Sequence, residues 1–158
     1  YWNFGTTDTP PDYWIDRGAN ITYSQITGYA GQYGLRMVKT GAVSYITYQF
    51  IVGYQSLLGR WVNFSGWVKT SDSAVSLTIY DDVLGQSGTL HPGDGEWHFI
   101  STYKKIPTTA TQIRAIVNCG SSPTSQVIDV SGLMMNYGQS PVQFVPHQLD
   151  DLLASHVV

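Results

Sequence analysis

The sequence predicts an all-β chain, folded as a β-sandwich of about eight or more antiparallel strands. Gly, Ser, Thr and Tyr are abundant while good helix formers are scarce, and Glu96 is the only Glu. Apolar and polar residues alternate with a period of two in runs bounded by Gly, Pro, Asn or Asp. These runs recur about every ten to fifteen residues, a spacing typical of a jelly-roll sandwich.

Eight segments fit the strand pattern when the chain is read in order. The expected strands are a short one at residues 20–23 and longer ones at 34–39, 43–52, 61–69, 74–80, 97–103, 112–118 and 127–136. A Gly-rich loop is expected at residues 81–95, and a turn at residues 120–123.

The strand pattern ends before the C-terminus, so the chain divides into two parts. Residues 1–142 form the jelly-roll domain, and residues 143–158 form a C-terminal extension or linker. In the extension, Leu149, Leu152 and Leu153 stand at helix spacing. It is therefore either a short helix that packs on the sandwich or the start of a linker or oligomer neck leading to another domain.

Charge and composition exclude several classes of partner. The net charge is −3 and only 12% of residues are charged, against about 25% in average proteins, so we expect no nucleic-acid partner. No apolar run is long enough to insert into a membrane. Cys119 is the single cysteine and allows no internal disulfide. Because the chain begins at Tyr1 rather than Met, we expect a processed or excised fragment.

Alternation along a strand assigns each residue to the core face or to the outer face of the sandwich. Phe64 belongs to the apolar set of residues 61–69, so Trp67 belongs to the outer face. The same reasoning places three further side chains on an outer face: Tyr80, Arg114 and Asn118. Trp97, which begins a strand after a hairpin turn, is expected in the core.

The face assignment is ambiguous in residues 43–52, because both alternating sets contain aromatic and β-branched residues. We assign the set that contains Tyr48 and Phe50 to the core. This leaves Tyr45 and Gln49 on the outer face.

Several short motifs follow one another in a specific order. They are Asn3-Phe4-Gly5, GQYGLRMVKTG (31–41), GRWVNFSGWVKT (59–70), VSLTIYDD (75–82), GDGEWHFISTYKKIPTTATQIRAIV (93–117) and VIDVSGLMMNYG (127–138). Their order and spacing resemble the carbohydrate-binding jelly-roll modules of families four, nine and twenty-two, over about residues 3–140. The ending, residues 132–147, resembles the copies in bacteriophage tail fibres and other tail-associated proteins.

The resemblance implies a non-catalytic module that binds a polysaccharide or a host surface glycan. It also implies an extracellular location on a virion tail, or a secreted protein, and a homo-oligomer (a trimer) formed through the parent fibre. The alternative is a structural spacer or oligomerisation domain of a virion tail protein that binds no glycan.

The outer rows combine aromatic rings with a cation and amides, a mixture that suits sugars. A pyranose stacks its apolar face on an aromatic ring, and its hydroxyl groups pair with amides and guanidinium groups. The candidate ligand-binding residues are Trp67, Tyr80, Gln49, Arg114, Asn118 and Tyr45. An edge site formed by Trp2, Tyr13 and Trp14 is the alternative location, unless these residues cap the core.

A structural calcium ion is a further implication of the resemblance, held between the opening strand and Asp129. The sequence departs from the family pattern after Phe4, where Gly5 stands in place of an acid. The alternative role of Asp129 is to accept hydrogen bonds in a buried turn.

Other side chains that carry chemistry fit structural roles better. His91, Asp94, Glu96 and His98 lie within eight residues, but Gly93-Asp94-Gly95 is a turn signature that favours a hairpin over a metal site. Asp81 and Asp82 are adjacent and would point to opposite faces of a strand, so they do not form a catalytic pair. Cys119 is expected to be a buried thiol. We therefore predict no enzymatic activity.

Overall fold

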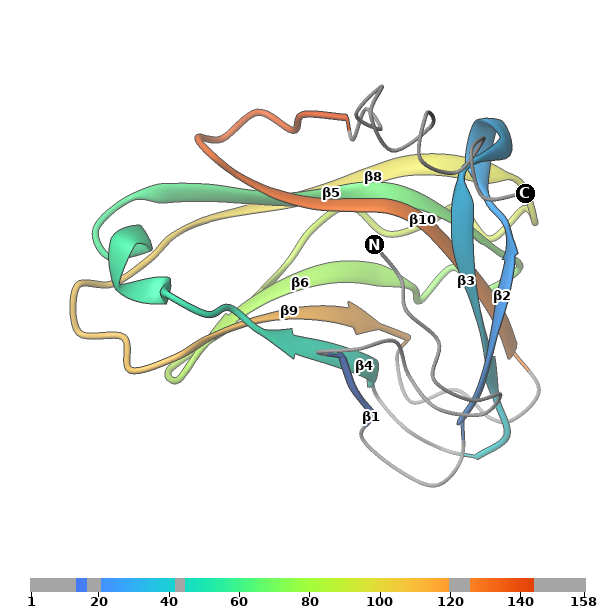
Figure 1. Cartoon of the computed structure of the whole chain (residues 1–158), viewed down its shortest axis with the longest axis horizontal. Coiled ribbons are helices and arrows are strands. Elements are labelled where there is room, and N and C mark those ends of the chain that lie inside the picture. Colours follow the sequence, from blue (N-terminus) through green and yellow to red (C-terminus); the bar gives the residue numbers. More distant parts are fainter. Residues whose placement is uncertain (1–13, 17–20, 42–44, 120–125, 144–158) are drawn as a thin grey trace, which may run out of the picture.

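The protein is a β-sandwich in which two antiparallel sheets pack face to face (Figure 1). The computed structural model describes residues 14–16, 21–41, 45–119 and 126–143. In spatial order, sheet A consists of β1 (Trp14–Asp16), β4 (Tyr45–Phe50), β9 (Ile113–Asn118), β6 (Ser76–Asp81) and β7 (Gly85–Ser87). In the same way, sheet B consists of β2 (Ile21–Thr27), β3 (Tyr33–Lys39), β10 (Gln126–Tyr137), β5 (Trp61–Thr70) and β8 (Trp97–Lys105).

This architecture confirms the predicted all-β jelly-roll. The eight expected strands are all present, as β2 to β6 and β8 to β10. Two short 3₁₀ turns, Tyr29–Gly31 and Tyr54–Leu57, complete the regular structure of the described residues. No helix in these ranges is long and apolar enough to cross a membrane. Most of the predicted C-terminal extension, residues 144–158, lies outside the described residues.

The core lies between the two sheets and follows the predicted alternation. On β5 the buried apolar set contains Phe64 and Val68, and on β6 it contains Leu77 and Ile79. Cys119, just after β9, is also fully buried, as predicted. Strand alternation therefore leaves one outer face on each sheet for contacts with solvent or a ligand.

Two short strands were not predicted. β1 pairs with β4, and its Trp14 packs against the core. β7 pairs with β6 at the other edge of sheet A, inside the expected Gly-rich loop. Each contains only three residues, too few to show the alternation on which the prediction depends.

Candidate functional site

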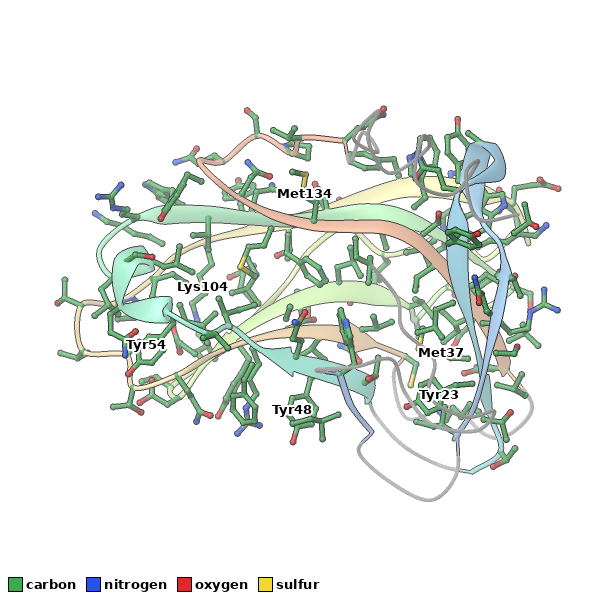
Figure 2. The ribbon with its side chains drawn as sticks, viewed as in Figure 1. Tyr23, Met37, Tyr48, Tyr54, Lys104 and Met134 are labelled. Atoms are coloured by element: carbon green, nitrogen blue, oxygen red, sulfur yellow. The ribbon has the colours of Figure 1, made fainter. Side chains whose placement is uncertain are left out.

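Four side chains gather on the outer face of sheet A: Tyr48, Phe50, Tyr80 and Arg114, here called the Arg114 cluster. Arg114 on β9 is the register partner of Phe50 on β4 and of Tyr80 on β6, so the three side chains form one row across the sheet. Tyr48 lies on the same face of β4, and Figure 2 shows it projecting away from the sandwich interior.

The guanidinium of Arg114 lies against all three aromatic rings. Its Cζ is 5.0 Å from the ring centroid of Tyr48, 4.7 Å from that of Phe50 and 5.4 Å from that of Tyr80. These distances are within the range of cation–π attraction. Arg114 also donates from Nε and Nη2 to Oε1 of Gln112, at 3.1 and 2.9 Å. The guanidinium is therefore held in one orientation on an aromatic surface.

The structure brings together some of the predicted ligand-binding residues and separates others. Tyr80 and Arg114 face outward, as predicted, and are register partners on neighbouring strands. Asn118 lies further along β9 on the same face, half-buried and opposite Ser76. Tyr45 belongs to β4, but its side chain lies outside the described part of the chain.

The assignment of β4 was wrong. Gln49 pairs with Ala115, whose side chain is in the core, so Gln49 faces inward. Tyr48 and Phe50, which were predicted to be in the core, face outward, and Phe50 is 40% exposed. Contact with Arg114 makes the outer face favourable for these two aromatic side chains.

Trp67 lies on the opposite side of the molecule from Tyr80, because β5 belongs to sheet B. Its ring is stacked against Tyr29 from the turn between β2 and β3, with centroids 3.5 Å apart and an interplanar angle of 11°. Phe99 on β8 lies beside Trp67, and the centroids of these two rings are 5.4 Å apart. The candidate ligand-binding residues Trp67 and Tyr80 therefore face outward from different sheets and do not share one site.

The outer face of sheet B carries further aromatic packing and is partly covered. Trp97 pairs in register with Lys69 and meets Tyr29 edge-on, so it lies on this face and not in the core as predicted. Asn63 and Ser65, both 0% exposed, donate to the carbonyls of Gln139 and Val142. In Figure 1 the segment after β10 runs back over β5. This strap removes the middle of the face from solvent.

One end of this sheet remains open and forms a second candidate surface. A groove of about 460 Å³ lies beside β8 and the segment that follows β7. Trp61 and Tyr103 line it, with ring centroids 5.9 Å apart, and they are 39% and 51% exposed. Thr89 and Lys105 add polar groups to the lining.

Asp129 has a different partner from the implied calcium ion. It is 3% exposed, and its two carboxylate oxygens accept hydrogen bonds from Nε and Nη2 of Arg36 at 2.8 and 2.9 Å. The hydrogen bond and the charge of Asp129 raise the pKa of Arg36. On the neighbouring strand β5, Lys69 is the register partner of Asp129. This ion pair accounts for both carboxylate oxygens of Asp129, and the opening residues that would complete a calcium site lie outside the described ranges, so the calcium ion stays a prediction.

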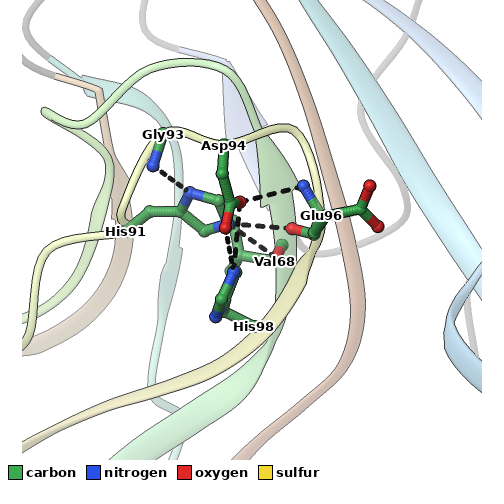
Figure 3. A network of polar contacts seen from close by, with 6 residues as sticks. All are labelled: Val68, His91, Gly93, Asp94, Glu96 and His98. Atoms are coloured by element: carbon green, nitrogen blue, oxygen red, sulfur yellow. Dashed lines mark hydrogen bonds and ion pairs between the residues drawn. The ribbon is translucent and has the colours of Figure 1, made fainter.

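His91 is a buried structural histidine (Figure 3). Its Nε2 lies 3.1 Å from the carbonyl oxygens of Val68 and Glu96, so this nitrogen carries the proton and donates it. Its Nδ1 accepts from the backbone N–H of Gly93 at 2.9 Å. Neither ring nitrogen retains a free lone pair for a metal.

Asp94 and His98 form hydrogen bonds within the same hairpin. Asp94 accepts hydrogen bonds from the backbone N–H of Glu96 and from Nε2 of His98, at 3.0 and 2.9 Å. These contacts lower the pKa of Asp94. Ligand-type atoms of His91, Asp94 and His98 do lie within 4.8 Å of one another. Because His91 is fully hydrogen-bonded, this geometry favours the turn that the sequence indicated.

The adjacent acids at the end of β6 also have structural partners. Asp81, 0% exposed, forms an ion pair with Nζ of Lys104 at 2.7 Å and accepts from the backbone N–H groups of Val83 and Leu84. Asp82 accepts from the backbone and hydroxyl of Thr111. Both carboxylates hold loops in place.

Comparison with known structures places this fold among carbohydrate-binding modules of families 22, 16 and 4. No family model and no curated protein matches the sequence. The C-terminal family 22 module of Clostridium thermocellum Xyn10B is similar at a TM-score of 0.62 and 15% identity, over 89% of this chain and 96% of that one. These similarities concern the fold.

Two larger proteins contain a similar domain. The CBM22-1 and GH10 modules of C. thermocellum Xyn10B, solved with xylohexaose, match at a TM-score of 0.60 and 19% identity, over 85% of this chain and 28% of that one. Tailspike protein 4 of bacteriophage CBA120 matches at a TM-score of 0.57 and 14% identity, over 80% of this chain and 20% of that one. This chain therefore spans less than a third of either protein.

Proposed function

We propose that this protein is a carbohydrate-binding module whose binding surface is the outer face of sheet A, centred on the Arg114 cluster. The observation that carries the proposal is the row formed by Phe50, Arg114 and Tyr80 across three strands. A pyranose ring would stack on the exposed aromatic surface, and its hydroxyl groups would accept hydrogen bonds from the guanidinium.

The other aromatic surfaces of the described residues are less suitable. Trp67 already has Tyr29 stacked on its ring, and the strap after β10 covers the middle of sheet B. The groove beside Trp61 and Tyr103 is open, but its two rings are inclined to each other by 53° and offer no continuous stacking plane.

The module would act by binding alone, within a larger extracellular protein. The similarity to a phage tailspike supports a virion tail, and the similarity to a xylanase supports a secreted enzyme. In either setting the ligand would be a polysaccharide or a host surface glycan. Single-site affinity would be modest, and several copies on one oligomeric fibre, such as a trimer, would add avidity.

A polysaccharide array tests this proposal. The wild-type chain should bind at least one polysaccharide, and Tyr80→Ala and Phe50→Ala should each reduce binding about five- to tenfold, because each removes a stacking surface worth about 1–1.4 kcal/mol. Trp61→Ala is the matched control, since it removes an exposed aromatic ring from the other sheet. Loss of binding only in Trp61→Ala would move the site to the groove.

A blank array would contradict the proposal. If the chain also formed defined oligomers in light scattering, the alternative role as a structural spacer of a tail protein would be supported. Circular dichroism of each variant verifies that lost binding does not come from lost folding.

A further inference from the structure

The outer face of sheet A carries one charged side chain among its described residues. The outward row of β9 is Arg114, Ile116 and Asn118. The outward rows of the flanking strands consist of aromatic, aliphatic and hydroxyl-bearing residues and Gly85. Within the described outward rows of these strands, the guanidinium of Arg114 is therefore the one charged group, and the carboxylate of Asp82, just beyond β6, is bonded to Thr111.

Unlike Arg36 and Lys104, Arg114 has no acidic partner among the described residues. Arg36 is paired with Asp129, and Lys104 is paired with Asp81. Arg114 donates only to the neutral amide oxygen of Gln112, through Nε and Nη2. Because an arginine has five N–H donors, three of them, on Nη1 and Nη2, are available to a ligand.

We propose that this face selects glycans that carry carboxylate groups, such as polyuronates, and that Arg114 binds the carboxylate. This inference rests on the proposed function, since it names the ligand class of the same site. The Nη1 and Nη2 side of a guanidinium matches the two oxygens of a carboxylate. Arg36 and Asp129 form a two-point contact of this kind within the same molecule, through Nε and Nη2.

The surroundings of Arg114 prepare it for this role. Three aromatic rings and Gln112 fix the guanidinium before any ligand arrives. A fixed donor loses little conformational entropy on binding. The rings also displace water from one side of the charge, which strengthens its interaction with an anion. Stacking would supply affinity, and the carboxylate contact would supply the choice among sugars.

The test compares polysaccharides that differ only in charge. The probes are alginate, polygalacturonate and hyaluronan, each with its carboxyl-reduced form, which keeps the chain but is neutral. We expect at least one acidic form to bind, and its reduced form to bind about tenfold or more weakly, as expected for loss of a charge-assisted contact. Raising NaCl from about 20 to about 500 mM should weaken binding of the acidic form.

Variants at Arg114 assign the effect to this residue. Arg114→Gln should weaken binding of the acidic form about tenfold more than binding of the reduced form, because the amide of Gln can still donate to a hydroxyl group while the charge-assisted contact is lost, so the preference disappears. Arg114→Lys should keep part of the preference for the acidic form, because the positive charge remains but the planar guanidinium group is lost. Arg60→Gln is the matched control, since Arg60 also lies over an aromatic ring, that of Tyr137, at 5.3 Å, outside the Arg114 cluster.

The outcomes separate the two proposals. If the reduced forms bind as well as the acidic ones, or if Arg114→Gln weakens both equally, carboxylate selection is wrong and carbohydrate binding stands. The same conclusion follows if the chain binds neutral xylan or β-glucan and none of the acidic probes. If no polysaccharide of either kind binds, both proposals are wrong.

Discussion

At the scale of single residues, the ion pair between the buried Asp81 and Lys104 is expected to contribute strongly to stability. Burial by itself would raise the pKa of Asp81, but hydrogen bonds from Lys104 and from the N–H groups of Leu84 and Val83 outweigh it and lower the pKa. Lys104 also donates to the carbonyl of Leu84. The pair therefore ties β8 to the loop after β6.

Asp81→Asn should lower the free energy of unfolding at pH 7 by about 3 kcal/mol, because it leaves Lys104 without its counter-charge. The lowered pKa means that the stabilisation is complete above the unfolded pKa of about 3.9 and is lost as the pH falls through the folded value. Urea unfolding between about pH 7 and 2.5 measures both effects. Glu96→Gln, at an exposed carboxylate, is the control, and an equal acid response in Asp81→Asn and the wild type would contradict this account.

Cys119 gives a second prediction at this scale. Its side chain is 0% exposed, and burial raises the pKa of the thiol to about 11. The thiolate that reacts with disulfide reagents is therefore scarce at pH 8. We expect no reaction with Ellman's reagent in the native protein and one thiol per chain in guanidinium chloride. Rapid labelling of the native protein would show that this part of the core opens readily.

At the scale of elements, β7 and the residues after it are held tightly against β8. A Cβ atom at Gly88 would overlap the carbonyl of Ser101. The same contact region contains the hydrogen bonds from Thr89 N–H to Ser101 and from the Thr102 hydroxyl to Gln86. Gly88 is therefore required by the close approach of two backbones.

Gly88→Ala should lower the free energy of unfolding by about 1–3 kcal/mol, the usual range for an overpacked site. Gly85→Ala is the matched control, because a Cβ there would make ordinary contacts of 3.5 and 3.6 Å with Thr78 and Tyr80. Urea denaturation of both variants provides the measurement. Equal stability of the two variants would contradict the close packing of β7 on β8.

The sequence predicts elements better than it predicts contacts between them. Strong alternation in β5, β6 and β9 identified both the strands and their core faces. β4 has aromatic side chains on both faces, so alternation alone could not show that Phe50 points outward. Only its pairing with β9, beside Arg114, decides the orientation.

Long-range contacts account for the other differences in the candidate site. Trp67 faces outward, as its position in β5 predicts, but Tyr29 comes from a turn between two other strands. Nothing in the spacing of these two residues indicates that their rings stack. The strap that covers Asn63 and Ser65 is equally distant in sequence.

At the scale of the whole molecule, the two outer faces differ in how far their aromatic side chains are covered. On sheet B, Tyr29, Trp67 and Phe99 pack against one another, while on sheet A the Arg114 cluster is partly exposed. Trp67→Ala should therefore lower the free energy of unfolding by about 2 kcal/mol or more and leave glycan binding unchanged. Thermal denaturation and the polysaccharide array measure the two effects separately. Loss of binding in a folded Trp67→Ala variant would contradict this division.

Amide chemical-shift mapping tests the central claim, the location of the binding surface, most directly. The isotope-labelled chain is titrated with an oligosaccharide of the polysaccharide that binds best on the array. We predict that the largest shifts fall on β4, β6 and β9, around Phe50, Tyr80 and Arg114. Shifts concentrated on β5 and β8, around Trp61 and Tyr103, would contradict the claim and place the site at the groove of sheet B.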